Sequence, residues 1–191
     1  EIELSHIRDD ISKQFGYLSV YAVELSRGLS ESIEKNLQNR GIQVKDLSKH
    51  PEVLEDILEN EYERLLFSLQ KAKSSGVFVI LDATVNPHLE NAAYSRAGLY
   101  LKNMEPNIIS SSDPTIQVLH GFPKIARNNS LPLHSQWTME MDIRDASFFR
   151  LPMEQAKRYR LPLSRLYYWS SPLILPGTSE KVMLCSIPLI D

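Results

Sequence analysis

Gly76-Val77-Phe78-Val79-Ile80-Leu81-Asp82 is the stretch where the sequence changes from a helical to a strand-like pattern. Its apolar run from Val77 to Leu81 is continuous, which is typical of a strand buried on both faces. Before this stretch, apolar residues recur every three or four positions; after it, short strand-like segments alternate with turn-rich ones. The sequence therefore predicts an α+β fold, with a helical region over 1–75 and a sheet-forming module over 76–191.

The region before Gly76 predicts two long helices. The first runs from about residue 2 to Asn39, and Gly41 lies where a C-terminal cap belongs. The second begins near Pro51, a favoured first-turn residue, and Gly76 ends it. The first helix carries an apolar stripe at spacings of three and four, as in an amphipathic helix or a coiled-coil seam. The stripe consists of Leu4, Ile7, Ile11, Phe15, Leu18, Ala22, Leu25 and Leu29.

Both ends of the chain are abrupt. The helical pattern is already running at Glu1, and an apolar stretch closes at Asp191. We therefore expect a segment of a longer protein, entered by a long helix that connects it to another part.

After Leu81 the sequence predicts strands with short helices between them. The last strands are joined by tight turns, so we expect one mainly antiparallel sheet with the first helix packed along it. The stretch 106–114 is rich in Ser, Asn, Asp and Pro and is expected to be a loop. The expected strands are Arg96–Asn103, Trp137–Asp142, Leu166–Leu175 and Glu180–Ile190, the last two forming a hairpin, and the expected helices are Thr115–Arg127 and Phe148–Tyr159.

The composition excludes several classes of protein. With 42% hydrophobic and 24% charged residues the chain is an ordinary globular sequence with enough apolar residues for a core. The net charge of -3 and the scattered Lys and Arg give no support to nucleic-acid binding. No apolar segment approaches the roughly 20 residues that span a bilayer. A single cysteine, Cys185, excludes an internal disulfide framework and is expected to be a small buried residue in a strand.

The usual catalytic motifs are missing. The sequence has no phosphate-binding loop, no dinucleotide glycine fingerprint and no G-x-S-x-G elbow. Its five histidines are far apart, and none has zinc-type spacing. We expect no cofactor, no metal and no catalytic residue in this segment.

Aromatic residues, methionines and a few charges concentrate between Trp137 and Trp169. Apolar walls with a few orienting polar groups are what a small-molecule pocket needs, although a core with an aromatic belt gives the same pattern. Because side chains alternate along a strand, Tyr167 and Trp169 are expected on one face of their strand. For the same reason Trp137 and Met139 are expected to share a face of theirs. We expect a pocket over the sheet, walled by Trp137 or Trp169 and capped by the segment 142–159.

Three segments of the last third follow one another in a distinctive order. An Arg-containing segment precedes an aromatic and a short helix, a strand ends in Ser-Pro, and a final strand ends in Pro-x-x-Asp. The segments are Asp142-Ile143-Arg144-Asp145-Ala146-Ser147-Phe148-Phe149, Tyr167-Tyr168-Trp169-Ser170-Ser171-Pro172 and Val182-Met183-Leu184-Cys185-Ser186-Ile187-Pro188-Leu189-Ile190-Asp191. This order resembles the Cache domains, the extracytoplasmic PAS-like sensor domains of prokaryotic membrane receptors, which begin with a long helix leaving the membrane.

The resemblance implies a ligand-sensing module of a sensor histidine kinase, a chemoreceptor or a cyclic-dinucleotide enzyme. By position, Arg144 lies in the Arg-containing segment, and Phe148 or Phe149 takes the place of the aromatic that follows it. Tyr167 and Trp169 lie on the strand that lines the pocket in such domains. Asp191 matches the acidic residue that meets the ligand ammonium in amino-acid-binding members.

The pocket pattern and the resemblance together give the predicted ligand-binding residues. Arg144 and Asp191 are its expected polar anchors, with the guanidinium holding an anionic ligand group. The full set is Trp137, Met139, Arg144, Phe149, Tyr167, Trp169 and Asp191.

Three functions from different classes remain open on the sequence. The leading one is an extracytoplasmic sensor domain at the cell membrane that binds a small molecule, forms a homodimer through its first helix and passes the signal to a cytoplasmic output domain. The segment itself would be soluble and tethered to the membrane by segments outside it. The alternatives are a small enzyme with an acid/base site at Asp142, Arg144 and Asp145, and a helical module that only dimerises.

Overall fold

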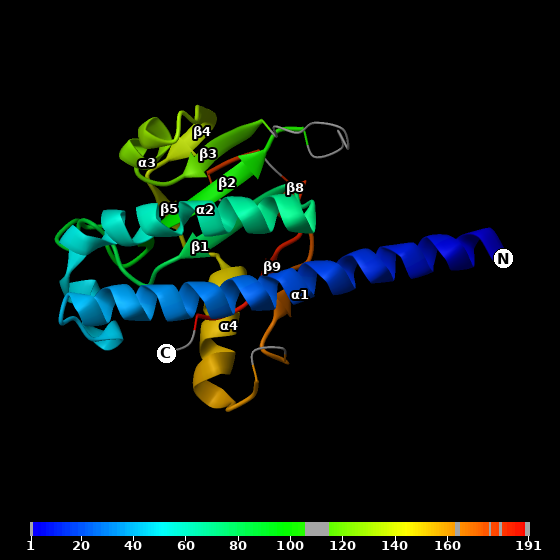
Figure 1. The fold of residues 1–191 in the computed structure, drawn as a ribbon, viewed down its shortest axis with the longest axis horizontal. Coiled ribbons are helices and arrows are strands. Elements are labelled where there is room, and N and C mark those ends of the chain that lie inside the picture. The colour runs from blue at the N-terminus through cyan, green and yellow to red at the C-terminus, as the bar shows by residue number, and fades with distance from the viewer. Residues whose placement is uncertain (1, 106–114, 163–164, 176, 180, 190–191) are drawn as a thin grey trace.

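The computed structural model describes the whole chain except residues 1, 106–114, 163–164, 176, 180 and 190–191, and over residues 2–15 it describes the helix but no side chains. Its architecture is α+β, as predicted. Two long helices, α1 and α2, lie side by side against a twisted sheet (Figure 1).

The helices before residue 76 follow the sequence prediction. α1 ends just before Gly41, whose φ of 70° lies in the left-handed region that glycine tolerates. The second predicted helix begins at Pro51 with a 3-10 turn, because the fixed φ of proline suits a first turn. It ends before Gly76, at Lys73, whose φ is 52°. The helical elements are α1 (Ile2–Asn39), η1 (Val44–Lys49), η2 (Pro51–Val53), α2 (Leu54–Ala72), α3 (Pro123–Asn128) and α4 (Ser147–Arg158).

The main sheet has β2 at its centre. β2 pairs antiparallel with β1, β3 and β5, whereas β3 and β4 pair in parallel, so the sheet is mixed rather than purely antiparallel. Among the described strands β1 pairs with β2 alone, so β1 forms an edge of the sheet. The strands of this sheet are β1 (Gly76–Ile80), β2 (Ser95–Asn103), β3 (Ile116–His120), β4 (Leu133–Thr138) and β5 (Glu140–Asp142).

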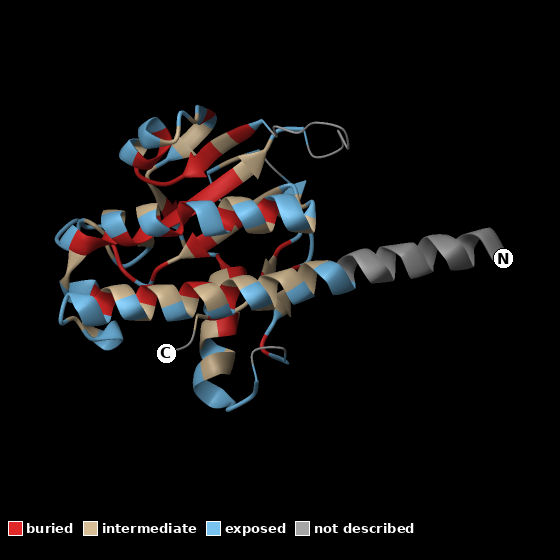
Figure 2. Ribbon diagram, viewed as in Figure 1, coloured by how far each residue is buried: buried red, intermediate tan, exposed pale blue. Residues whose placement is uncertain are grey.

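Both faces of the sheet are covered, as the apolar run of β1 predicts. Val77 and Val79 lie in the core shared with α1 and α2. The alternate residues Phe78 and Ile80 pack into a second cluster with Phe148 of α4 and with residues near the C-terminus. Figure 2 shows the buried residues concentrated in the strands and along the two long helices. The helical region and the sheet-forming module therefore share one core.

The C-terminal hairpin is present, but it is separate from the main sheet. It consists of two short antiparallel pairs, β6 (Tyr168–Trp169) with β9 (Cys185–Ser186) and β7 (Leu173–Ile174) with β8 (Lys181–Val182). Between the pairs, the amide of Ser170 donates to the Leu184 carbonyl and the Leu184 amide donates to the Ser170 hydroxyl, each at 2.8 Å. The expectation of one continuous sheet over 76–191 was therefore wrong.

Two further expectations are corrected. The helix predicted over Thr115–Arg127 is the strand β3 followed by the short helix α3, because Gly121, at a φ of 146°, breaks the segment and Pro123 starts the helix. The strand predicted over Trp137–Asp142 is interrupted at Met139, where the chain leaves β3 and joins β2. The predicted loop 106–114 lies outside the described residues.

Candidate ligand-binding cavity

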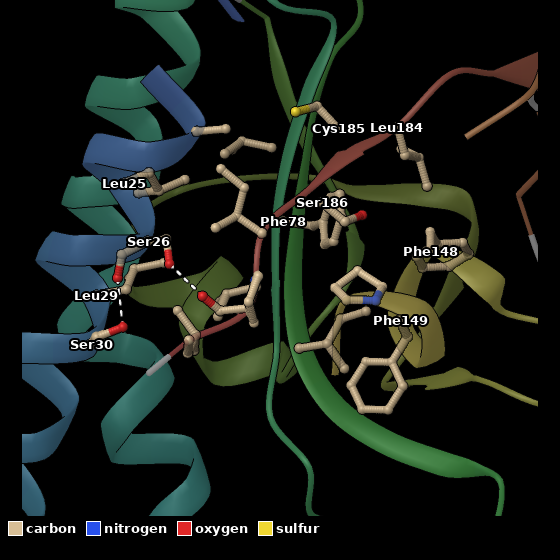
Figure 3. A pocket seen from close by; sticks show the side chains of 18 of the residues that line it. Leu25, Ser26, Leu29, Ser30, Phe78, Phe148, Phe149, Leu184, Cys185 and Ser186 are labelled. Atoms are coloured by element: carbon tan, nitrogen blue, oxygen red, sulfur yellow. Dashed lines mark hydrogen bonds between the residues drawn. The ribbon is translucent and has the colours of Figure 1, made fainter. Parts of the chain in front are cut away.

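A cavity of about 830 Å³ lies along the free edge of β1, within the 300–1,000 Å³ range typical of small-molecule sites. Its walls come from α1, β1, α4 and residues 182–189, which we call the C-terminal segment (Figure 3). We call this space the α1 cavity.

The α1 wall is the second half of the apolar stripe that the sequence predicts. Leu18, Ala22, Leu25 and Leu29 all line the cavity. Because they are spaced by three and four residues, they fall on one side of the helix. From Leu18 onward the stripe is therefore turned toward the rest of its own chain.

The β1 and α4 walls are aromatic. The Phe78 ring stacks on Tyr100, with centroids 5.7 Å apart and planes at 9°, and meets Phe148 edge-on at 6.1 Å. These offset and edge geometries are the favourable ones for aromatic pairs. Phe149 and Met153 of α4 also line the cavity, and Figure 3 shows Phe148 and Phe149 across the space from the labelled α1 residues.

The C-terminal segment closes the cavity and ties it to α1. The hydroxyl of buried Ser26 donates to the carbonyl of Pro188 at 2.7 Å, and Ser30 donates to the carbonyl of Ser26 at 2.7 Å (Figure 3). Burial raises the pKa of the Cys185 thiol to about 12, so this cavity-lining thiol stays protonated and is a poor nucleophile.

The charged residues of the lining lie at its edges. Lys45, Lys73, Asp82 and Lys157 are exposed to solvent, and Asp82 accepts a hydrogen bond from Arg96 at 2.9 Å. Glu34, at the α1 edge, is partly exposed. The interior of the cavity is thus made of aliphatic and aromatic side chains with a few hydroxyls.

The structure brings only two of the predicted binding residues to the α1 cavity, Phe149 and Trp169. Trp137 and Met139 pack against the core on the helix side, where the Trp137 indole donates to the Gly121 carbonyl at 3.0 Å. Tyr167 is 45% exposed and does not line the cavity. Asp191 lies outside the described residues.

Arg144 is also away from the cavity. Its guanidinium binds Asp142, with Nη2 at 2.5 Å from Oδ2, and lies over the ring of Tyr94 at 5.3 Å. This hydrogen bond holds the pKa of the Asp142 carboxyl below its usual range, so the carboxyl stays ionised. Both side chains are largely exposed, which makes the pair a surface ion pair rather than a buried acid/base site.

Several buried polar side chains lie outside the cavity, among them Glu61 and His120. Glu61 of α2, which is 1% exposed, accepts hydrogen bonds from Ser32 of α1 at 2.5 Å and from Arg64 at 3.2 Å. His120, at the end of β3, contacts the Thr138 hydroxyl at 2.7 Å, and burial lowers its pKa to about 4. Among the described residues, no group of three or more His, Cys, Asp or Glu is arranged to hold a metal ion.

Sequence reasoning identified α4 and Trp169 as parts of the pocket but missed the α1 and C-terminal walls. The apolar stripe of the first helix was the available signal for the α1 wall, because its residues from Leu18 to Leu29 are those that line the cavity. The contact between Ser26 and Pro188, 162 residues apart, has no local signature.

The chain was compared with protein-family models, with curated proteins and with solved structures, and none of the three comparisons found a match. The likeness to Cache domains therefore stays a prediction from the sequence. Among the described residues, no helix combines the length and apolar character that crossing a membrane requires.

Proposed function

We propose that this chain is the ligand-sensing domain of a transmembrane receptor, extracytoplasmic and dimeric through α1, which binds a small molecule in the α1 cavity. The observation that carries the proposal is that the cavity and the long helix share a wall. A ligand in this space contacts Leu18, Ala22 and Leu25 directly, and so acts on α1 without any intermediate element.

Signalling needs two states of α1 that bind the ligand with different affinity. Such a difference has a physical source here, because Leu18, Ala22 and Leu25 are only partly buried whereas Leu29 and Leu37, which also line the cavity, are almost fully covered. A ligand therefore covers more new surface of α1 around Leu18 to Leu25 than around Leu29 and Leu37. The order of sequence elements, which resembles that of Cache domains, agrees with this function.

The first experiment asks whether the cavity binds a ligand. A thermal-shift screen of small metabolites should find compounds that stabilise the chain, by about 2.7 kcal/mol at 100 times the dissociation constant. Ala22→Leu places a larger side chain in the cavity wall and should reduce the shift. Ala93→Leu adds the same side chain at an exposed position of the β1–β2 connection and should leave the shift unchanged.

The second experiment asks whether binding moves α1. Spin labels at the exposed positions Glu24 on α1 and Asn91 in the β1–β2 connection, in a Cys185→Ala background, report the distance between helix and sheet. A hit from the screen should shift or redistribute that distance, and Ala22→Leu should reduce the change. Binding with an unchanged distance distribution would make the chain a binding module and not a sensor.

A further inference from the structure

We infer that the α1 cavity takes an uncharged, largely apolar ligand that carries one hydroxyl or carbonyl group, and that Ser186 is the residue that binds this group. The inference rests on the proposed function, since it names the ligand class of the same cavity. Three features of the wall support it.

The first feature is the absence of an internal counter-ion among the described lining residues. The charged side chains of the wall lie at the edges and are exposed, or partly exposed in the case of Glu34. A charged ligand group placed between Leu25, Phe78 and Phe149 would lose its hydration without gaining an opposite charge, and such burial is strongly unfavourable.

The second feature is the hydroxyl of Ser186, in the C-terminal segment. Ser186 lines the cavity, is 5% exposed, and its Oγ has no hydrogen-bond partner among the described residues. In the view of Figure 3 it lies between the α1 residues on one side and Phe148 on the other. A buried hydroxyl without a partner is unfavourable, so a ligand that supplies a partner gains affinity from it.

The third feature is that the neighbouring buried serine hydroxyls already have partners. Ser26 donates to the Pro188 carbonyl, and the Ser170 hydroxyl accepts from the Leu184 amide. Of these three buried serines, Ser186 is therefore the one whose hydroxyl can both donate to and accept from a ligand without breaking a hydrogen bond between described residues. Because a serine hydroxyl both donates and accepts, and rotates between staggered positions, it suits a ligand hydroxyl or carbonyl equally.

The test uses three probes with one ring system: pyrene, 1-pyrenemethanol and pyrene-1-carboxylate. Their direct binding to the full chain is measured by fluorescence at neutral pH. The alcohol should bind about three- to tenfold more tightly than pyrene, the range that one neutral hydrogen bond gives, and at least about tenfold more tightly than the carboxylate. Ser186→Ala should remove the advantage of the alcohol and leave the affinity for pyrene unchanged.

Ser19→Ala is the matched control, because Ser19 lies on α1 but outside the cavity lining, and its hydroxyl donates to the Gly16 carbonyl. It should leave all three affinities unchanged, and circular dichroism with thermal melts should show that each variant folds. Tightest binding of the carboxylate, or an alcohol advantage that survives Ser186→Ala, would overturn the ligand class while leaving the cavity as the site. Binding of no probe, or binding unaffected by Ala22→Leu, would overturn the proposed function as well.

Discussion

Acidification from neutral pH toward pH 4 should destabilise this protein through one buried side chain, His120. The ring is 2% exposed, meets Tyr100 edge-on at 6.1 Å and contacts the Thr138 hydroxyl at 2.7 Å. That hydroxyl has a single proton, which it donates to the carbonyl of Glu140 at 2.7 Å. The hydroxyl must therefore accept from His120, so the neutral ring carries its proton on Nδ1.

The magnitude follows from the lowered pKa. Burial, together with a smaller effect of the nearby His134, lowers the pKa of His120 from 6.5 to about 4, although hydrogen bonding to Thr138 opposes this shift in part. Between these pH values the unfolded chain takes up a proton that the folded chain does not, so the free energy of unfolding falls as the pH falls. Each pH unit removes up to about 1.4 kcal/mol, and the full interval about 3 kcal/mol. Above about pH 7.5 His120 contributes almost no pH dependence, because its ring is then neutral in both states.

The assay is urea denaturation at several pH values between 7.5 and about 4, comparing the wild type with His120→Asn. The asparagine amide can still donate to Thr138 but does not titrate, so this variant should lose the part of the slope that His120 causes, whatever its stability at pH 7. His88→Asn, at an exposed position, should keep the wild-type slope. Equal slopes in the wild type and His120→Asn would refute the reasoning, since they would mean that His120 takes up its proton equally in both states.

Three other predictions follow from the geometry. Gly98→Ala should lower the free energy of unfolding by about 1–3 kcal/mol in urea titrations, because its Cβ would lie 2.6 Å from a backbone carbonyl of β1. Gly16→Ala is the contrasting variant: a Cβ there meets nothing within 4 Å, so alanine should stabilise α1 by up to about 1 kcal/mol. Cys185 should react with Ellman's reagent at pH 8 about a hundredfold more slowly than free cysteine and rapidly in urea, and fast labelling of the folded chain would contradict its burial. The proposed dimer through α1 predicts that Val20→Cys, at a position 55% exposed on α1, crosslinks to its copy in membranes that contain the full-length protein, while Arg127→Cys on α3 does not. Equal yields would contradict this dimer.

The sequence predicted the elements whose signal is local. The limits of α1, the strand β2 and the helix α4 follow from periodicity and from Gly41 and Pro51, which act within a few residues. The strand β3 has a weak local signal, because the five residues Ile116–His120 are too few to separate a strand period from a helix period. The boundary between β3 and α3 lies at Gly121, whose positive φ ends the strand. The parallel pairing of β3 with β4 depends on register across the sheet, which no local pattern encodes.

The binding residues were harder to predict than the fold for the same reason. The many aromatic residues between Trp137 and Trp169 indicate that side chains are buried there. They do not indicate whether a given ring packs in the core or lines a cavity. The core takes Trp137, whereas Trp169 lies at the cavity. Arg144 was assigned by its position in a resemblance, but Asp142, two residues before it, binds its guanidinium at the surface.

The packing of α1 changes along its length, and this gradient decides where a ligand acts. Toward its C-terminal end the helix is fixed to α2 by the buried side chains of Ile33 and Leu37 and by the hydrogen bond from Ser32 to Glu61. Toward Leu18 the same side of the helix also lines the cavity but is only partly buried. Apolar burial stabilises a contact in proportion to the area removed from water, so an apolar ligand adds most where α1 is least covered. The C-terminal segment, joined to α1 through Ser26, lies beside the same ligand. A ligand in the cavity would therefore contact α1 and the C-terminal segment at the same time. The half of α1 that packs on α2 would stay in place, and the N-terminal half of α1 and the C-terminal segment could move relative to it.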